Sequence, residues 1–345
     1  MSDIHVPEAT PRVVVSGSIA FDYIMSFPGS FADYILPDKV HVLSVSFLYD
    51  SLVRLRGGVA GNVAYSLALL GERPALVGAG GSDFDAYRRA FEELGVDMRW
   101  VAADPESLTG SAFMTTDQTG NQIAGFYPGA SRLAADISVA ELAAGAEFGV
   151  VNPTTLEAMR RHSREFATGG CRLIYDPSQQ VVALPAEDIA EGIGLAWAVI
   201  GSDYELAIIE KKTGLSVDEI AGRVELLVVT YGSEGSEIRH GGERARIPIA
   251  PADPLRDPTG GGDAYRAGLI KGLLLGVPLE VAGRMASLAA TYAVELYGTQ
   301  EHCYTAEAYC SRFDATFPEF AGAIRPDWIA NPANPDWVGR PLVVR

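Results

Sequence analysis

Asp257-Pro-Thr-Gly-Gly-Gly-Asp-Ala-Tyr-Arg-Ala-Gly268 places three successive glycines and an acid in the first turn of an expected helix. The first N–H groups of a helix have no partner within it, and together they carry about half a positive charge. Gly260, Gly261 and Gly262 remove the side chains that would keep an anion away from these donors. The stretch therefore predicts a site that holds a phosphate group.

Asp263 is the unusual member of this stretch, because a carboxylate beside a phosphate repels it. Its presence is better explained as a base that takes a proton from an attacking hydroxyl, which predicts phosphoryl transfer to an alcohol. The alternative is a flexible glycine turn in which Asp263 only caps a helix running to Leu275. The buried stripe of that helix would be Ala267, Ile270 and Leu274.

The composition limits the class of protein. The chain has 345 residues, of which 48% are hydrophobic, enough for one large α/β core or two modest ones. Its formal charge of −17 repels the phosphates of nucleic acids and membranes, so we expect neither as a partner. Cys171, Cys303 and Cys310 form no Cys-x-x-Cys pair, and no apolar run approaches the ~18 residues of a membrane span. A cytoplasmic location is expected.

Short apolar runs alternate with helical patterns along most of the chain. Continuous apolar strands of this kind predict a mainly parallel sheet covered by helices on both faces, a doubly wound α/β domain spanning residues 1–318. Two helical segments, 62–70 and 278–297, are strongly periodic. The expected strands are 12–16, 148–151, 172–175, 198–200 and 226–230.

Two regions break this rhythm. Residues 40–56 alternate between apolar and polar, and residues 111–116 can pair with 122–127 across a short turn. Alternation marks strands with one exposed or ligand-facing side, which predicts a small β lid built from about 37–58 and 111–127. The prolines and weak periodicity of residues 319–345 predict an extended C-terminal arm.

A second glycine cluster, Arg56-Gly-Gly-Val-Ala-Gly-Asn62, joins a lid strand to a helix. Asn62 is a neutral donor and acceptor that suits sugar hydroxyls, although structural packing explains the cluster about as well. Asp22 follows the first strand, where ligands bind in open α/β sheets, and a carboxylate can accept from two hydroxyls at once. The alternative for Asp22 is a turn or cap residue.

The sequence lacks the glycine-rich loops of P-loop NTPases and dehydrogenases and the nucleophile elbow of α/β hydrolases. Its two glycine clusters instead resemble the two signatures of the ribokinase-like, or PfkB, carbohydrate kinases, and the likeness covers nearly the whole chain up to the tail. Within that family it most resembles the bacterial adenosine kinases. This narrower likeness rests on Gly17-Ser-Ile-Ala20, Arg56 to Asn62, Phe126-Tyr-Pro-Gly-Ala130, Asp176-Pro-Ser-Gln-Gln180 and Gly298-Thr-Gln-Glu301.

The resemblance implies a role for each matching residue. Asp263 would be the base, and the backbone N–H groups from Gly260 to Asp263 would form the anion hole. Phe113 and Phe126 would hold the base of a nucleoside between them; each lies in one strand of the predicted lid hairpin, and the alternative is lid core or a dimer contact. The expected ribose site comprises Ser18, Asp22, Gly57, Gly58 and Asn62, with Gln179 and Gln180 nearby.

The resemblance also implies ATP and Mg²⁺ as cofactors, with Glu205 holding the metal through water. The residues expected to contact ATP are Thr230, Gly232, Gly235 and Thr259. The chain departs from the family pattern at Ser202, where Asn is usual, and at Ala183, where related adenosine kinases tend to carry Arg. It leaves open whether a monovalent cation is needed and whether the lid pairs two subunits in a homodimer.

Three hypotheses result. The leading one is ATP-dependent phosphorylation of a nucleoside 5′-hydroxyl, above all adenosine to AMP in purine salvage. A free-sugar kinase acting on ribose or a hexose is the second, and the two lid phenylalanines argue against it because a free sugar offers no flat base. A non-catalytic nucleoside sensor is the third, and Asp263 argues against it because a sensor needs no base beside a phosphate.

Overall fold

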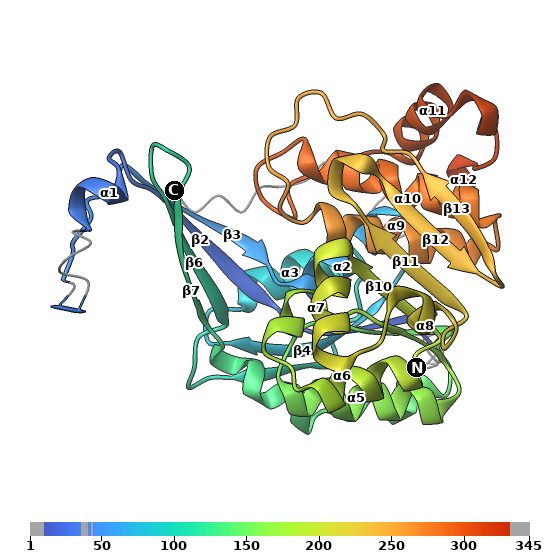
Figure 1. The fold of residues 1–345 in the computed structure, drawn as a ribbon, viewed down its shortest axis with the longest axis horizontal. Coiled ribbons are helices and arrows are strands. Elements are labelled where there is room, and N and C mark those ends of the chain that lie inside the picture. Colours follow the sequence, from blue (N-terminus) through green and yellow to red (C-terminus); the bar gives the residue numbers. More distant parts are fainter. Residues whose placement is uncertain (1–9, 36–40, 43, 332–345) are drawn as a thin grey trace, which may run out of the picture.

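The structure is a computed structural model that describes residues 10–35, 41–42 and 44–331. Its body is built on one large sheet, and a second, smaller sheet projects from the body (Figure 1). The large sheet is parallel from β11 to β5, and its last two strands, β12 and β13, are antiparallel. Its strands, in spatial order, are β13 (Glu243–Ile247), β12 (Ser236–His240), β11 (Leu226–Thr230), β10 (Ala198–Ser202), β9 (Arg172–Tyr175), β8 (Phe148–Val151), β1 (Val13–Ser16), β4 (Ala75–Gly81) and β5 (Val101–Asp104).

Helices cover both faces of this sheet, as the continuous apolar strands predict. Successive residues of β1 enter opposite cores: Val13 and Val15 pack in one, and Val14 in the other. The first core is covered by α2 (Val59–Leu69), α3 (Asp85–Glu93), α9 (Gly261–Leu275), α10 (Leu279–Val294) and α11 (Ala306–Thr316). The second is covered by α4 (Ala140–Ala143), α5 (Leu156–Gly169), α6 (Ala186–Leu195), α7 (Asp203–Thr213) and α8 (Val217–Ala221). The doubly wound α/β prediction is confirmed.

The small sheet is the lid, and its strand order is β3-β2-β6-β7. The predicted hairpin of β6 (Gly110–Thr116) and β7 (Gln122–Tyr127) forms, and β3 (Ser51–Gly57) lies within the other predicted lid segment. The strand expected within 40–46 is not found: residues 44–50 form none, while 36–40 and 43 lie outside the described residues. The remaining lid strand is β2 (Ala20–Ser26), and α1 (Phe31–Tyr34) follows it at the tip.

The predicted extended arm is wrong for its first half. Residues after 318 form a 3-10 turn, Pro318–Phe320, and a short helix, α12 (Pro326–Ile329). Ile324 and Ile329 are buried in the same core as α9 and α11. Burial of these two side chains ties the segment to the body. The prolines and weak periodicity of this segment did not indicate the packing. Residues 332–345 lie outside the described part of the chain.

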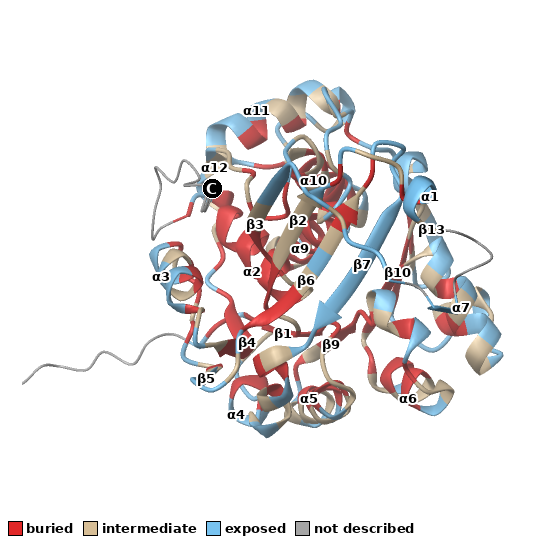
Figure 2. Cartoon of the chain, turned by 90° about the vertical axis from the view of Figure 1, so that its left-hand side faces the viewer, coloured by how far each residue is buried: buried red, intermediate tan, exposed pale blue. Residues whose placement is uncertain are grey.

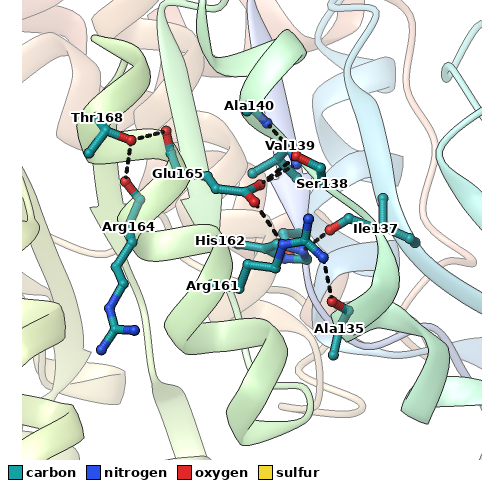
Figure 3. A network of polar contacts seen from close by, with 11 residues as sticks. Ala135, Ile137, Ser138, Val139, Ala140, Arg161, His162, Arg164, Glu165 and Thr168 are labelled. Atoms are coloured by element: carbon teal, nitrogen blue, oxygen red, sulfur yellow. Dashed lines mark hydrogen bonds and ion pairs between the residues drawn. The ribbon is translucent and has the colours of Figure 1, made fainter.

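A polar network fixes α5 to the segment between β7 and β8 (Figure 3). His162 bonds through Nε2 to the Ile137 carbonyl at 2.9 Å, and its Nδ1 lies 2.6 Å from Oγ of Ser16, the last residue of β1. Glu165 accepts from the Val139 amide at 2.6 Å and from Arg161 Nε at 2.7 Å. Burial lowers the pKa of His162, so its ring is neutral at pH 7. The network therefore ties α5 to the end of β1 and to the segment before β8.

Candidate active site

A cleft of about 850 Å³ opens at the carboxyl ends of the parallel strands, beneath the lid. The chain runs from β1 outward to β4 and β5 and then returns to β8 on the other side of β1. This reversal between β1 and β8 is where open α/β sheets bind ligands. The lining residues include Ser18, Asp22, Gly58, Asn62, Ala112, Met114, Ala124, Phe126, Thr154, Gln179, Gln180, Glu205, Thr230, Thr259, Gly260, Gly262, Asp263 and Arg266.

The residues predicted to form the anion hole lie at the start of α9. Gly260 adopts a left-handed conformation with φ of 80°, which favours glycine and turns the chain into the helix. Within the described chain, the amides of Gly260, Gly262 and Asp263 have no acceptor, and the Gly261 amide reaches the Pro258 carbonyl at 3.3 Å. Three donors at one helix start can therefore bind an anion.

Asp263 lies on the buried side of this helix start. Burial raises the pKa of Asp263 to about 6, while the Arg266 guanidinium and the Asn62 amide oppose the rise. Asn62 Nδ2 donates to Asp263 Oδ2 at 2.8 Å. With a pKa of about 6 the carboxyl group is mostly ionised at pH 7 and can accept a proton, as a general base must.

Asn62 is itself held by a buried chain of side chains. Gln300 Nε2 donates to Asn62 Oδ1 at 2.9 Å and to the Tyr87 hydroxyl at 2.7 Å. These contacts fix which end of the Asn62 amide faces Asp263. One N–H and one oxygen lone pair of Asn62 remain for a sugar hydroxyl.

Asp22 lies in the lid strand β2, and its side chain lines the cleft. This corrects the expectation that it directly follows the first strand: β1 ends at Ser16 and β2 begins at Ala20. Burial raises the pKa of Asp22 to about 6, with Asp263 and Asp257 adding to the rise. A Cβ on Gly57 would lie 2.3 Å from Asp22 Oδ2, so the glycine makes room for this carboxylate.

The remaining ribose-site predictions fall close to Asp22. Gly58 and Ser18 line the cleft, whereas Gly57 lies behind Asp22 and does not. Ser18 Oγ also accepts the Val59 amide at 3.0 Å and so caps the start of α2. Ser18 therefore has a structural role that the sequence did not reveal.

The two lid phenylalanines lie on opposite faces of the lid, so the predicted clamp is wrong. In the lid sheet Asp22 is opposite Ala112, and Ala112 is opposite Phe126, which places Phe126 on the cleft side. Phe113 is one residue further along β6, and side chains alternate between faces. Its ring stacks on Tyr23 at 4.9 Å, on the outer face. Phe126 lines the cleft without Phe113, and Met114 lies beside it.

Gln179 and Gln180 also line the cleft. They belong to the 3-10 turn Ser178–Val182, and Ser178 before them has a positive φ of 44°. This conformation is costly for a residue other than glycine and marks a constrained backbone at the cleft. Ala183, the position of one departure from the family, ends this turn and is not among the lining residues.

The predicted ATP contacts divide into two groups. Thr230 and Thr259 line the cleft, whereas Gly232 and Gly235 lie in the neighbouring turn after β11 and do not. Asp257 holds the loop before α9, accepting the Thr259 amide at 2.9 Å and the Gly298 amide at 3.1 Å.

Glu205 lines the cleft and is partly committed to its own helix. Its Oε2 accepts the Ser202 amide at 2.7 Å, and Ser202 Oγ accepts the Glu205 amide at 3.2 Å, a capping box at the start of α7. Ser202 therefore performs a capping role despite its departure from the family pattern. The second oxygen of Glu205 remains available for a metal-bound water. Over residues 10–35, 41–42 and 44–331, no group of three or more His, Cys, Asp or Glu side chains could hold a metal ion by itself.

The comparisons with known proteins agree with this geometry. The family described as pfkB family carbohydrate kinase matches residues 29–306. The chain belongs to this family. It is accordingly a phosphotransferase with an alcohol acceptor.

Similar proteins cover nearly the whole chain. A nucleoside kinase of Methanothermobacter thermautotrophicus is 33% identical over 306 residues, 87% of this chain and 94% of its own length. The structure of Burkholderia thailandensis nucleoside kinase in complex with inosine has a TM-score of 0.81 at 35% identity, covering 89% of this chain and 98% of that one. The Methanocaldococcus jannaschii nucleoside kinase structure has a TM-score of 0.77 at 25% identity, covering 89% and 99%. The family prediction is confirmed, while the adenosine branch stays a prediction.

Several residues of this kinase site were missed by the sequence reasoning. Met114 escaped it because the register of β6 was unknown, and Gln300 because its contacts are distant in sequence. Arg266 stands within the first quoted stretch, three residues after Asp263, and the helical repeat places the two side by side. That spacing could have identified it.

Proposed function

We propose that this kinase transfers the γ-phosphoryl group of ATP to the 5′-hydroxyl of a nucleoside, with adenosine to AMP as its preferred reaction. The observation that carries the proposal is the apolar inner face of the lid, which lies over the polar end of the cleft. Ala112, Met114, Ala124 and Phe126 form this face, and the Phe126 side chain is 58% exposed. A nucleoside base would cover these side chains, whereas a free sugar offers no flat apolar surface.

Each polar group then has a role in positioning the acceptor. Asp22 and Asn62 would hold the ribose hydroxyls and so bring the 5′-oxygen towards Asp263. Asp263 would accept the proton as the 5′-oxygen attacks the γ-phosphorus and ADP leaves. The unpaired amides of Gly260, Gly262 and Asp263 would hold the oxygens of the transferring phosphoryl group.

ATP would extend from this anion hole along Thr259 and Thr230, which line the same cleft. Mg²⁺ usually keeps several waters and binds one or two carboxylates besides phosphate oxygens, and the single free oxygen of Glu205 fits that pattern. When bound, Mg²⁺ would neutralise charge on the phosphates. A monovalent cation requirement stays open.

The relatives support a nucleoside acceptor. Two structures of the Burkholderia thailandensis nucleoside kinase are complexes with inosine and with ADP-inosine, and the chain is 35% and 36% identical to them. Inosine is therefore the second purine nucleoside to test.

The lid also supports a homodimer as part of this proposal. Its outer face carries apolar side chains that are 41% to 57% exposed, among them Leu52, Phe113, Ile123 and Tyr127. Burying such a patch against a second copy would remove it from water. Light scattering on the purified protein should give twice the monomer mass, and a monomer at all concentrations would exclude the dimer.

The proposal is tested by comparing kcat/KM across adenosine, inosine, guanosine, cytidine, ribose and fructose. We expect a purine nucleoside, with adenosine first, to exceed both free sugars. Phe126→Ala should raise the KM of the nucleoside by about five- to a hundredfold, because stacking on an aromatic face is worth roughly 1 to 3 kcal/mol. Phe113→Ala, on the other face of the same hairpin, should change it far less. A higher kcat/KM for ribose or fructose would favour the free-sugar kinase.

A further inference from the structure

Arg266 lies directly beneath the anion hole. It follows Asp263 by three residues on α9, and the two side chains are only 9% and 12% exposed. Arg266 Nη1 lies 3.8 Å from Asp263 Oδ1. The same nitrogen lies 2.7 Å from the position of a Cβ built on Gly262. One edge of the guanidinium therefore faces both the base and the glycines that hold the phosphoryl group.

The other edge of Arg266 is fixed by a buried carboxylate. Arg266 Nη2 donates to Asp176 Oδ1 at 2.7 Å, and its Nε pairs with Asp176 Oδ2. Asn152 Nδ2 donates to Asp176 Oδ2 at 2.7 Å. Asp176 follows β9 and Asn152 follows β8, so two strand ends of the large sheet hold the guanidinium in one orientation.

The charges around Asp263 show why a cation is placed there. Burial disfavours the Asp263 carboxylate, and the nearby Asp176 and Glu205 disfavour it further, whereas Arg266 favours it. The groups that face or influence this carboxyl, element by element, are Asn62 on α2, Asp22 on β2, Asp176 after β9, Glu205 on α7 and Arg266 on α9 itself.

We propose that Arg266 is a positioning residue that keeps Asp263 ionised and holds its Oδ1 towards the acceptor hydroxyl, while Asp176 and Asn152 hold Arg266. This inference rests on the proposed function, in which Asp263 is the base. In the transfer step, the acceptor oxygen bonds to the γ-phosphorus and the bond from that phosphorus to ADP breaks. The acceptor proton passes to Asp263 Oδ1, which must therefore be unprotonated at the start.

The consequence is a specific pH dependence. With Arg266 in place, Asp263 titrates at about 6, and kcat/KM should fall as the pH drops through that value. An opposite charge at this distance lowers the pKa of a carboxyl group by roughly 1 to 3. Removal of the Arg266 charge should therefore shift the acid limb of the profile, the pH at which kcat/KM falls, to higher pH by about that amount. If Arg266 had only a structural role, its replacement would lower kcat/KM at every pH without shifting the pH of the acid limb.

The experiment is the profile of kcat/KM against pH for the wild type and Arg266→Gln, from pH 5 to pH 9.5. We expect the variant to lose most activity below pH 7 and to recover towards high pH. Because Arg266→Gln leaves the buried Asp176 carboxylate without its cationic partner and with only the Asn152 amide, the double variant Asp176→Asn/Arg266→Gln is the second test. The acid limb of the double variant should also lie at higher pH than that of the wild type. The shift should be smaller than in Arg266→Gln, because the negative charge of Asp176 is removed as well.

Two further variants sharpen the comparison. Arg266→Lys keeps the positive charge but loses the two-pronged guanidinium pairing with Asp176. Its acid limb should therefore stay at the pH of the wild type while its rate falls. Arg160→Gln is the matched control: Arg160 pairs with both oxygens of Asp188 between α5 and α6, away from the cleft, and its loss should leave the profile unchanged.

The outcomes separate the two proposals. If the limbs of Arg266→Gln and of the double variant coincide with that of the wild type while Asp263→Asn is inactive, the inference about Arg266 is wrong and the proposed base survives. If Asp263→Asn keeps wild-type turnover, the proposed base itself is wrong. An acid limb shifted to higher pH in Arg266→Gln and in the double variant Asp176→Asn/Arg266→Gln, together with an inactive Asp263→Asn, supports the inference.

Discussion

Gly57→Ala should impair nucleoside binding through a residue that it does not replace. A Cβ at position 57 would lie 2.3 Å from Asp22 Oδ2 and 2.7 Å from Asp22 Cγ, where ordinary contact begins at 3.4 Å. The Asp22 carboxylate must therefore move by about 1 Å, which would break the hydrogen bonds that we propose it makes to the ribose hydroxyls. A hydrogen bond to a charged group is worth about 1.5 to 3 kcal/mol, so one lost bond corresponds to roughly a ten- to hundredfold rise in the nucleoside KM.

The assay is steady-state kinetics with adenosine varied at saturating ATP, and then with ATP varied at saturating adenosine. We expect Gly57→Ala to raise the KM of adenosine by that factor and to leave the KM of ATP nearly unchanged. Gly194→Ala in α6 is the matched control, because a Cβ there meets no atom within 4 Å.

A double-variant comparison tests whether Asp22 transmits the effect. Asp22→Ala alone should raise the nucleoside KM and reduce the discrimination between adenosine and 2′-deoxyadenosine. Adding Gly57→Ala to Asp22→Ala should then have little further effect, since both changes act on one contact. An unchanged KM in Gly57→Ala, or a full additional loss in the double variant, would refute this reasoning.

Three further outcomes follow from the structure. Lys271→Met should lower the free energy of unfolding by about 1 to 3 kcal/mol in urea titrations, because Glu72 loses its partner at 2.6 Å and keeps the partly exposed Arg12 at 3.8 Å. Burial lowers the pKa of His302 to about 4, so its contribution to stability is complete above its ordinary value near 6.5 and declines as the pH falls towards 4. The wild type should accordingly lose about 2 kcal/mol relative to His302→Gln between pH 7.5 and pH 5; equal losses in the two proteins would contradict this. Adenosine should slow hydrogen exchange over residues 111–127, and unaltered exchange during turnover would argue against a lid that covers the nucleoside.

Much of the fold could be predicted because its signals are local. The parallel strands β1, β8, β9, β10 and β11 are short apolar runs and were predicted, whereas the glycine-rich β4 and the short β5 were not. The three glycines before Asp263 mark a helix start in the sequence itself. The burial of these elements agrees with their apolar sequences: β1, β4, α2 and α9 are largely buried, whereas the lid strand β7 is exposed along its whole length (Figure 2).

The errors arose where the answer depended on pairing between distant segments. Phe113 and Phe126 both lie in the lid hairpin, but the register that opposes Ala112 to Phe126 sends Phe113 to the outer face. Asp22 lies in a lid strand because Ala20–Ser26 pairs with both β3 and β6, which no local pattern of β2 reveals.

Arg266 was missed for a different reason. Its spacing of three residues from Asp263 places it beside that carboxyl group, but helix α9 is buried on nearly every side, so no polar face draws attention to the pair. Its partners, Asp176 and Asn152, come from the ends of two other strands. Only the folded sheet brings these three side chains together.

The central claim is tested most directly by following the phosphoryl group from ATP to the acceptor oxygen. Purified enzyme, Mg²⁺, γ-labelled ATP and adenosine should give labelled AMP, and 5′-deoxyadenosine, which lacks only the acceptor hydroxyl, should give none. Asp263→Asn should bind adenosine with near wild-type affinity and lose about a hundred- to ten-thousandfold in turnover. Labelled product from 5′-deoxyadenosine, or an Asp263→Asn enzyme that keeps more than about a tenth of wild-type turnover, would contradict the account.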